Sequence, residues 1–267
     1  MRFVSISTDD GPRAALERDG RAYPYDRSLD ELIADGLPAS DPGGEGVLIT
    51  EAGLLAPLGS PGKLICIGQN YHAHAREQGA EAPKLPTFFA KWPNALAAPG
   101  ASVPLPAWSR VDYEAEVAFV IGRRAKDVPE ERALEHVAAY SLLNDLSARD
   151  YQFKTPQWMP GKVFDGSAPF GPALVTPDEA GPHDAIEFSL ILNGETMQEG
   201  STADLVHSVP ALVAYLSMLM TLEPGDVVST GTPAGVGSLR DPRVWLAEGD
   251  EVIISSPTLG VLETRLA

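Results

Sequence analysis

Most of this chain consists of short apolar runs separated by glycine, proline and polar clusters. Runs of about four to eight residues bounded in this way are typical of β-strands. Beyond residue 60, they predict strands at 63–67, 87–91, 112–121, 185–192, 226–230, 250–255 and 259–265. Helical segments fall between them at irregular intervals. The pattern therefore predicts an α+β domain dominated by mixed sheet, not a regular βαβ winding.

Three helices carry start or stop signals. Asn70 is expected to cap a helix that Gly79 stops, and Pro129 to open a second one. Ser208 opens the third, over Val209 to Met220. This last segment is apolar nearly all round, which predicts a buried helix.

The first 60 residues form a different pattern. Strands are predicted at 2–6 and 13–18, and Ser28-Leu29-Asp30-Glu31 is a capping box for a short helix that Gly36 ends. A polar, glycine- and proline-rich stretch follows at 41–45, and Ser60-Pro61-Gly62 marks a boundary. We therefore expect a small N-terminal α+β unit at 1–60 and a main domain at 61–267.

Charge and cysteine content narrow the function classes. The chain has 37 Asp and Glu against 20 Lys and Arg, a formal net charge of −17, which argues against nucleic acid or an anionic membrane as partner. A small anionic substrate stays open, because a bound metal and a few local cations can dominate one pocket. The single cysteine, Cys66, is compatible with a reducing compartment, and the N-terminus lacks a secretory pattern. We expect a cytoplasmic protein without a membrane span.

Three carboxylates stand out beside apolar runs. Glu114 and Glu116 are two residues apart at the head of an apolar strand, so their side chains point to the same face. Asp145 ends a second apolar run, Val137 to Leu143. Buried carboxylates need a partner, and a divalent cation can serve two like charges at once. Glu-x-Glu on a strand is also common on solvated faces, but the apolar continuation of this face favours a metal site.

A histidine and a glutamate form a second candidate pair. On the predicted helix, His74 and Glu77 are three positions apart and share a face. A carboxylate beside an imidazole raises its basicity and fixes its tautomer, as a base that activates water requires. A surface His–Glu pair is the plainer alternative. His72 and His74 could instead be two ligands on a strand, but the helix signals disfavour this.

Two loop segments complete the polar candidates. Lys162 lies between glycine turns and beside aromatic residues, which suits anion or oxyanion binding, although a solvated loop lysine fits the same pattern. The glycine-rich stretch 229–237 has neither the lysine of a phosphate loop nor a dinucleotide fingerprint. Its backbone N–H groups could hold a carboxylate or enolate oxygen, or it could be a plain turn.

Taken in order, these segments resemble the fumarylacetoacetate hydrolase superfamily. The matching pieces run through most of the main domain: Gly68-Gln69-Asn70-Tyr71, His74 and Glu77, Asp112-Tyr113-Glu114-Ala115-Glu116, Asn144-Asp145-Leu146-Ser147-Ala148-Arg149-Asp150-Tyr151-Gln152, Gly161-Lys162-Val163-Phe164-Asp165, and the glycine-rich stretch 229–237. Residues 1–60 look like the family's variable N-terminal unit. Residues 61–73 contain no Asp or Glu, so the chain is similar to the short subgroup with three metal-binding carboxylates.

The resemblance implies a fold and a set of roles. The fold would be a mixed β-sandwich roll, usually dimeric. The cation would be Mg²⁺ or Mn²⁺, or Ca²⁺ as in some members, held by Glu114, Glu116 and Asp145. His74 and Glu77 would activate water from a segment that is often a mobile lid in relatives, and Lys162 would be the catalytic lysine. The remaining implied substrate contacts are Arg149, Gln152 and Thr232.

Family membership leaves the reaction open. We expect a metal-dependent hydrolase that cleaves a C–C bond in a β-diketo acid of the acylpyruvate type, through an enolate that the metal stabilises. The alternatives on the same scaffold are an oxaloacetate-type decarboxylase and a 2-hydroxyhepta-2,4-diene-1,7-dioate isomerase/decarboxylase. A non-catalytic oligomeric module with a structural cation is the remaining alternative, and the presence of both a metal set and a His–Glu pair weighs against it. The expected partners are a small anionic keto acid and a second copy of the chain.

Overall fold

The N-terminal strands are continuous with the main sheet of the molecule in the computed structural model, which describes residues 1–267. Strand β1 pairs with β14 through Arg2↔Val175 and Phe3↔Leu174. The capping box of Ser28 and Glu31 is formed as expected. The N-terminal elements are β1 (Arg2–Thr8), β2 (Gly11–Arg18), β3 (Arg21–Pro24), α1 (Leu29–Asp35), β4 (Val47–Leu48) and β5 (Leu54–Leu55).

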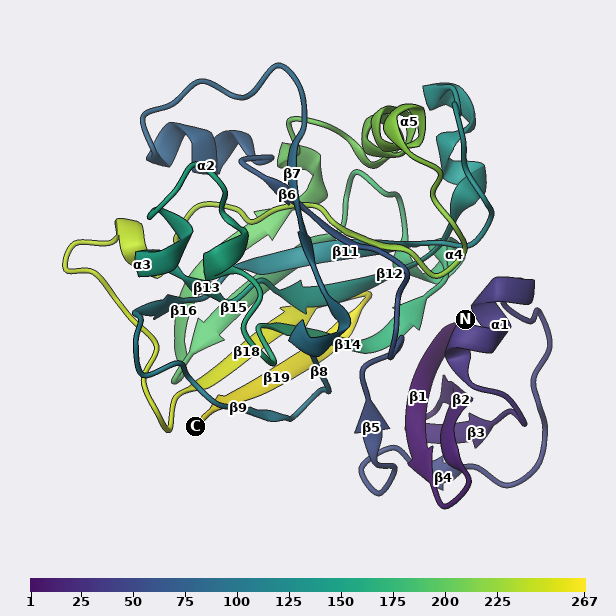
Figure 1. Cartoon of the computed structure of the whole chain (residues 1–267). Coiled ribbons are helices and arrows are strands. Elements are labelled where there is room, and N and C mark those ends of the chain that lie inside the picture. The colour runs from purple at the N-terminus through teal and green to yellow at the C-terminus, as the bar shows by residue number, and fades with distance from the viewer.

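The main sheet has 12 strands, and its longest path runs β4-β3-β2-β1-β14-β12-β11-β17-β6-β7 (Figure 1). Most neighbours are antiparallel, but β17 pairs parallel with β6. The sheet is therefore mixed, as the sequence predicts. Its strands beyond the N-terminal unit are β6 (Leu64–Gly68), β7 (Thr87–Lys91), β8 (Leu96–Ala97), β11 (Ala115–Ile121), β12 (Val137–Asn144), β14 (Ala168–Val175) and β17 (Val227–Ser229).

A second sheet of five strands runs in the order β16-β15-β18-β19-β9. It comprises β9 (Ser102–Val103), β15 (Glu187–Leu192), β16 (Glu195–Ser201), β18 (Glu251–Ser256) and β19 (Gly260–Leu266). A two-stranded ribbon, β10 (Val111–Asp112) with β13 (Ser147–Ala148), lies beside the site described below.

Every residue of β11 is buried, because both faces of this strand are covered. Val117, Phe119 and Ile121 belong to a core of 41 residues that includes inward-facing residues of the second sheet and of helix α5. Ala118 and Val120, on the other face, belong to a core of 17 residues that includes side chains of β1 and α1. The sheet-dominated α+β architecture of the prediction is thus confirmed, with its central strand between two apolar layers.

The helices are short and lie around the sheets. The α-helices of the main domain are α2 (His72–Glu77), α3 (Arg149–Gln152), α4 (Pro177–Ala180) and α5 (Val209–Leu219). The 3-10 helices are η1 (Pro93–Ala95), η2 (Glu130–His136), η3 (Met159–Gly161), η4 (Thr202–Asp204) and η5 (Gly237–Leu239).

Three local predictions were wrong. Tyr71, not Asn70, precedes helix α2, and the Asn70 side chain instead bonds the backbone of His207 and Thr230. The helix expected after Pro129 is a 3-10 helix that gives way to strand β12 at Val137. Helix α5 is not buried all round, because Met218 and Leu219 are 55% and 50% exposed at its end.

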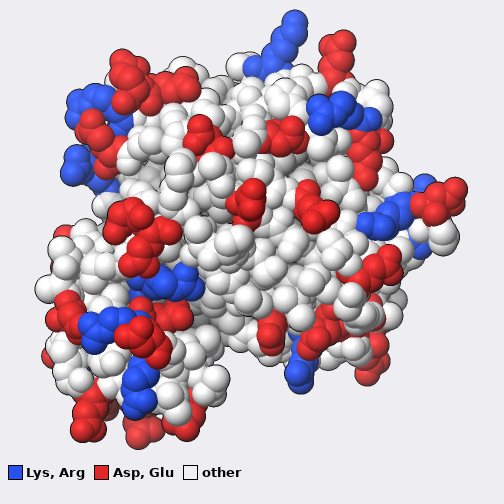
Figure 2. Space-filling model, turned by 180° about the vertical axis from the view of Figure 1, so that it is seen from behind, with Lys and Arg blue, Asp and Glu red and all other residues white.

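On the face seen in Figure 2, acidic groups are spread out rather than gathered at one place. This face is opposite to that of Figure 1, and it carries red and blue side chains around its edge and over the N-terminal unit. A few separate red side chains stand in its upper centre, with mostly uncharged surface around them. Among the helices, none combines the length and the apolar character needed to cross a membrane.

Candidate active site

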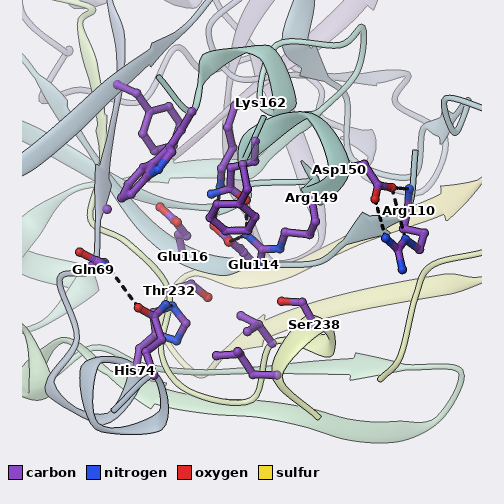
Figure 3. A pocket seen from close by; sticks show the side chains of 18 of the residues that line it. Gln69, His74, Arg110, Glu114, Glu116, Arg149, Asp150, Lys162, Thr232 and Ser238 are labelled. Carbon is purple, nitrogen blue, oxygen red and sulfur yellow. Dashed lines mark hydrogen bonds and ion pairs between the residues drawn. The ribbon is translucent and has the colours of Figure 1, made fainter. Parts of the chain in front are cut away.

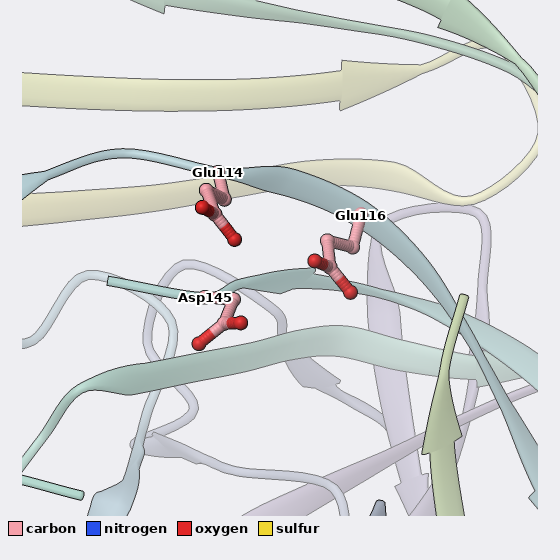
Figure 4. A group of neighbouring side chains, drawn as sticks. All are labelled: Glu114, Glu116 and Asp145. Atoms are coloured by element: carbon pink, nitrogen blue, oxygen red, sulfur yellow. The ribbon is translucent and has the colours of Figure 1, made fainter. Parts of the chain in front are cut away.

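The three predicted carboxylates meet at the end of β11 and β12. Ala115 pairs with Asn144 across these antiparallel strands, so Glu114 and Glu116 lie beside Asp145, which directly follows β12. Their side-chain oxygens approach within 4.8 Å of one another, and all three carboxylates are buried (Figure 4). The sequence placed this cluster correctly.

The strand expected at 112–121 is interrupted, which is a correction to the prediction. Regular pairing stops at Tyr113 and Glu114, and Asp112 belongs to the separate ribbon strand β10, where it pairs with Ser147. A backbone hydrogen bond of 2.9 Å from the N–H of Asp145 to the carbonyl of Glu114 joins the two segments at the break. The irregular backbone still directs Glu114 toward the cluster.

Glu116 has no cationic side chain as a partner. One of its oxygens accepts hydrogen bonds from the hydroxyl of Ser229 and, at 3.0 Å, from the N–H of Gly231. Burial, together with the charges of Asp145 and Glu114, raises the pKa of Glu116 well above its usual range. The ionised form of this buried carboxyl group would need a positive charge beside it, and no cationic side chain of the protein supplies one.

The donor set fits a hard divalent cation. The Asp145 Oδ1 atom is buried and accepts no hydrogen bond, although the ammonium of Lys91 lies 2.8 Å away. The three carboxylates offer oxygens within 4.8 Å of one another, and the second oxygen of Glu116 accepts no hydrogen bond. All-oxygen sets of this kind suit Mg²⁺, Mn²⁺ or Ca²⁺ better than softer metals.

Lys162 is buried among the carboxylates rather than solvated. Its ammonium lies 2.8 Å from Glu114 Oε2 and 2.7 Å from Asp145 Oδ2. Burial alone would raise the pKa of Glu114, but the charges of Lys162 and Arg149 hold it at about 2. Burial acts against the charge of Lys162, and Asp145 and Glu114 reverse this effect, so that the pKa of Lys162 is raised. Lys162 is therefore a fixed cation.

Arg149 is also engaged by carboxylates of the protein. Its guanidinium donates two hydrogen bonds to Asp112 Oδ2, at 2.9 and 2.8 Å, and lies 2.6 Å from Glu114 Oε1. Its remaining amino group donates to Gln152 Oε1 at 2.8 Å. Asp112 in turn accepts hydrogen bonds from the N–H groups of Gly237 and Ser238. Arg149 thus connects the acidic cluster to the wall of the site.

The His–Glu pair forms as predicted, with Glu77 Oε2 at 3.0 Å from His74 Nδ1. The other ring nitrogen, Nε2, lies 2.7 Å from the amide nitrogen of Gln78. Because an amide nitrogen can only donate, Nε2 is the acceptor and Nδ1 carries the proton toward Glu77. Gln69 donates to Gln78 Oε1 at 3.0 Å and so fixes the orientation of that amide. His74 is buried, and both of its nitrogens are occupied.

The glycine-rich stretch after β17 contributes Thr232 and Val236 to the wall of the site. Thr232 donates to the carbonyl of Ala115 at 2.9 Å, and the N–H of Gly235 donates to Glu77 Oε1 at 2.9 Å. Gly235 has φ +103°, and a Cβ there would lie 2.3 Å from the carbonyl of Met197. Glycine is required at this position, and the stretch supports the His–Glu pair instead of being a plain turn.

One cavity of about 360 Å³ unites these groups (Figure 3). Of the predicted site residues, all but Glu77 and Asp145 line it, and those two contact lining residues. The lining is His74, Glu114, Glu116, Arg149, Gln152, Lys162 and Thr232, together with Ile67, Gly68, Gln69, Gln78, Phe89, Arg110, Asp150, Phe153, Trp158, Val236, Ser238, Leu239, Arg243 and Trp245.

Sequence reasoning missed four residues of the site. Lys91 ends strand β7 and is fully buried, a position that a lysine takes only with partners. Gln78 and Asp112 were seen only as neighbours of the motifs, and Arg243 follows a proline in a polar loop. Of these four residues, only Lys91 could have been detected from the sequence, because a charged side chain in an apolar strand indicates a buried ion pair.

The comparisons with known proteins agree with this geometry. The family model for the fumarylacetoacetate (FAA) hydrolase C-terminal domain matches residues 63–267. A protein of Xenopus laevis named oxaloacetate tautomerase fahd2, mitochondrial, is 43% identical over 98% of this chain and 89% of its own length. A fumarylacetoacetate hydrolase from Exiguobacterium antarcticum superposes with a TM-score of 0.91 at 35% identity, over 100% of this chain and 99% of that one. A 5-carboxymethyl-2-hydroxymuconate delta-isomerase from Mycobacterium smegmatis gives a TM-score of 0.86 at 34% identity, over 100% and 99%.

Proposed function

This chain belongs to the fumarylacetoacetate hydrolase family, and from that premise we propose that it converts a 2-oxo acid into its enol. The reaction we favour is keto–enol tautomerisation of an oxaloacetate-like acid. The observation that carries the proposal is the meeting of three buried carboxylates with a His–Glu pair around one cavity. The similarity to a protein named as an oxaloacetate tautomerase supports tautomerisation over the other reactions of the family.

The carboxylates of Glu114, Glu116 and Asp145 would hold the divalent cation, Mg²⁺ or Mn²⁺ in our proposal. A cation at such a site acts as a Lewis acid that makes the C–H bond beside a 2-oxo group more acidic. The positive charge of the cation is needed beside Glu116 in particular, because this side chain is buried and has no cationic partner. Without a cation beside it, the ionised form of Glu116 is unfavourable, and the pKa of its carboxyl group is therefore raised.

His74 is the proposed proton carrier. Glu77 accepts a hydrogen bond from Nδ1–H and leaves Nε2 as the basic nitrogen, which takes a proton from the carbon beside the 2-oxo group. The enolate oxygen takes up a proton from solvent to give the enol, and the imidazolium returns its proton to solvent. In the reverse direction the same nitrogen delivers a proton to the carbon. Lys162 does not suit this role, because Asp145 and Glu114 raise its pKa against the effect of burial and keep it protonated. Its fixed charge would stabilise the negative charge that develops on an oxygen of the substrate.

Gln78 must leave His74 before this step. Its amide occupies Nε2 at 2.7 Å, so neither a substrate carbon nor a water molecule can reach that nitrogen in this conformation. Gln78 is exposed at the end of helix α2, and its side chain can turn toward solvent without repacking the core.

Hydrolysis of an acylpyruvate C–C bond is the second candidate, as the sequence first suggested. The structural similarity to a fumarylacetoacetate hydrolase supports it. In that reaction His74 would deprotonate a water molecule that attacks the distal carbonyl, and Lys162 would stabilise the oxyanion. The carbon fragment that leaves would then be protonated to the second product.

A single assay separates these reactions. The purified protein is stripped of metal, reloaded with Mg²⁺ or Mn²⁺, and given oxaloacetate, acylpyruvates, fumarylacetoacetate and a hydroxymuconate-like diacid with the products identified. Enol–keto interconversion of oxaloacetate with no carbon lost supports tautomerisation. Two acid fragments indicate hydrolysis, and CO₂ indicates decarboxylation. No turnover on any member of the panel would refute the enolisation proposal and leave a non-catalytic module.

The assembly and location of the protein are separate proposals. We propose a homodimer, which light scattering on the purified chain tests directly. The expected cytoplasmic location is not confirmed, because the similar Xenopus laevis protein is named as mitochondrial. Imaging of the tagged protein in its own cell decides between these locations.

A further inference from the structure

The cations that line the cavity are of two kinds. Arg149 and Lys162 are buried and bound to carboxylates of the protein itself. Because their charges are already balanced by these carboxylates, a second carboxylate of a substrate would have to compete with buried ion pairs to bind them. Arg110 and Arg243 also line the cavity, but both are exposed and lie at its outer edge.

Arg243 forms no ion pair and no side-chain hydrogen bond within the protein. This is unusual in a chain where 37 acidic residues face 20 Lys and Arg. An arginine offers five N–H donors in a planar arrangement that matches a carboxylate. At the edge of a cavity, these free donors form a site for an anionic group of a ligand.

The loop that carries Arg243 is anchored just after this residue. The N–H of Val244 donates to the carbonyl of Gly237 at 3.0 Å, and Leu246 forms a β-bridge with Val111. Trp245 lies between these anchors, with its ring centre 5.2 Å from the guanidinium of Arg110. The backbone that follows Arg243 is therefore fixed by the fold.

Arg110 is the second cation of this edge. It binds Asp150 through Nη2 at 2.6 Å, and its side chain is 58% exposed. In Figure 3, the Arg110–Asp150 pair lies on the opposite side of Glu114 and Glu116 from His74. In this view His74 and Arg110 thus lie on different sides of the acidic cluster.

We propose that Arg243, supported by Arg110, binds a second carboxylate of the substrate, and that the enzyme prefers 2-oxo dicarboxylates to 2-oxo monocarboxylates. This inference rests on the proposed function for the place of the 2-oxo acid group at the acidic cluster. The carbon chain of the substrate would contact apolar lining residues of the cavity, which include Val236, Leu239 and Trp245.

Binding to the metal-loaded protein tests the subsite without turnover. Calorimetry compares 2-oxoglutarate with 2-oxopentanoate, which has the same carbon chain but no second carboxylate, and a parallel assay compares turnover of oxaloacetate with that of 2-oxobutanoate. We expect the parent protein to favour the dicarboxylate about tenfold in at least one pair, the value of one charge-assisted hydrogen-bonded contact. The preference should weaken at high salt because Arg243 is exposed.

Arg243→Gln should reduce the preference to within about twofold, with the affinity for oxalate, which only chelates, unchanged. The matched control is Arg21→Gln, an exposed arginine of β3 outside the cavity, which should keep the preference of the parent. A preference that survives in Arg243→Gln, or a parent that shows none in either pair, would overturn the subsite. Dicarboxylate preference in binding without any enolisation would instead refute the proposed function and leave the subsite standing.

Discussion

The amide nitrogen of Gln78 lies 2.7 Å from Nε2 of His74, so the nitrogen that the proposed chemistry needs is already occupied. Gln69 holds that amide in turn, and Gln69 itself has a left-handed backbone with φ 55°. Strained backbone of this kind is maintained only where the surroundings determine it. The three side chains form a latch that joins the end of β6 to the end of helix α2.

Removal of the latch should speed the reaction. Gln78→Ala leaves Nε2 free and removes the need to break one hydrogen bond, worth about 1 kcal/mol, before the substrate binds. We expect kcat/KM to rise about fivefold. The measurement is steady-state kinetics on the substrate that the panel identifies. His72→Ala, an exposed change on the same helix, is the control and should leave kcat/KM unaltered. A fall in kcat/KM for Gln78→Ala would show that Gln78 assists catalysis instead of restraining it.

Loss of the proposed proton carrier should affect turnover but not the metal. His74→Ala is expected to lower kcat by roughly 10²–10⁴-fold, the usual contribution of a general base. The affinity for Mg²⁺ should change by less than about twofold, because His74 contacts Glu77 and Gln78 and none of the three carboxylates. Glu77→Gln should lower kcat less, since the imidazole remains in place. Parent-like turnover by His74→Ala would remove His74 from the mechanism.

Lys162 should be essential for the stability of the metal-free protein. Lys162→Met leaves Glu114 and Asp145 buried without the ammonium that lies between them. Breaking a buried pair in this way costs about 3–5 kcal/mol of the free energy of unfolding. Urea unfolding in the presence of a chelator measures it, with Lys84→Met, an exposed lysine, as the control. Equal stability of Lys162→Met and the parent would mean that other groups compensate the two carboxylates.

Glu116→Gln should have the opposite effect on the metal-free protein. The pKa of Glu116 is raised in the folded state by burial, Asp145 and Glu114, whereas the unfolded chain ionises near its ordinary value of about 4.3. Below about pH 4 the carboxyl is protonated in both states, and the variant and the parent should unfold alike. As pH rises toward the folded pKa, the unfolded state releases its proton first and the parent loses stability relative to Glu116→Gln.

The check is a series of urea unfolding curves from about pH 4 to pH 8 on chelated protein, where the advantage of Glu116→Gln should grow with pH. Added Mg²⁺ should then stabilise the parent and not the variant. A variant that is less stable than the parent at pH 8 without metal would contradict the description of Glu116 as an uncompensated charge.

The strand pattern was predictable because each short segment is bounded by its own turn signals. Strand β7 has the predicted bounds, and β15 ends at the predicted Asn-Gly turn. Errors arose where a local signal competed with a tertiary contact. Asn70 has the chemistry of a helix cap, but its side chain bonds His207 and Thr230, which are remote in the sequence.

The residues of the site also divide into those that local signals indicate and those that only tertiary contacts determine. The sequence indicated Glu114, Glu116 and Asp145 because acidic side chains interrupt apolar runs, and it indicated His74 with Glu77 because helical spacing brings them together. The sequence did not indicate that Gln78 donates a hydrogen bond to Nε2 of His74, or that Arg149 donates to the carboxylate of Asp112. The two-unit division at residue 60 stays a prediction, since β1 pairs with β14 of the main sheet.

The sequence by itself determined the class of fold and the chemical character of the site, because strand periodicity and misplaced charge are local properties. Only the tertiary structure decided which charges neutralise one another. Lys162 and Arg149 form ion pairs with buried carboxylates, whereas Glu116 has no cationic partner. Arg243 lines the cavity and forms no ion pair within the protein. The physical reason is that electrostatic energies depend on distance and burial in space, and residues that meet at this site lie more than a hundred positions apart in the chain.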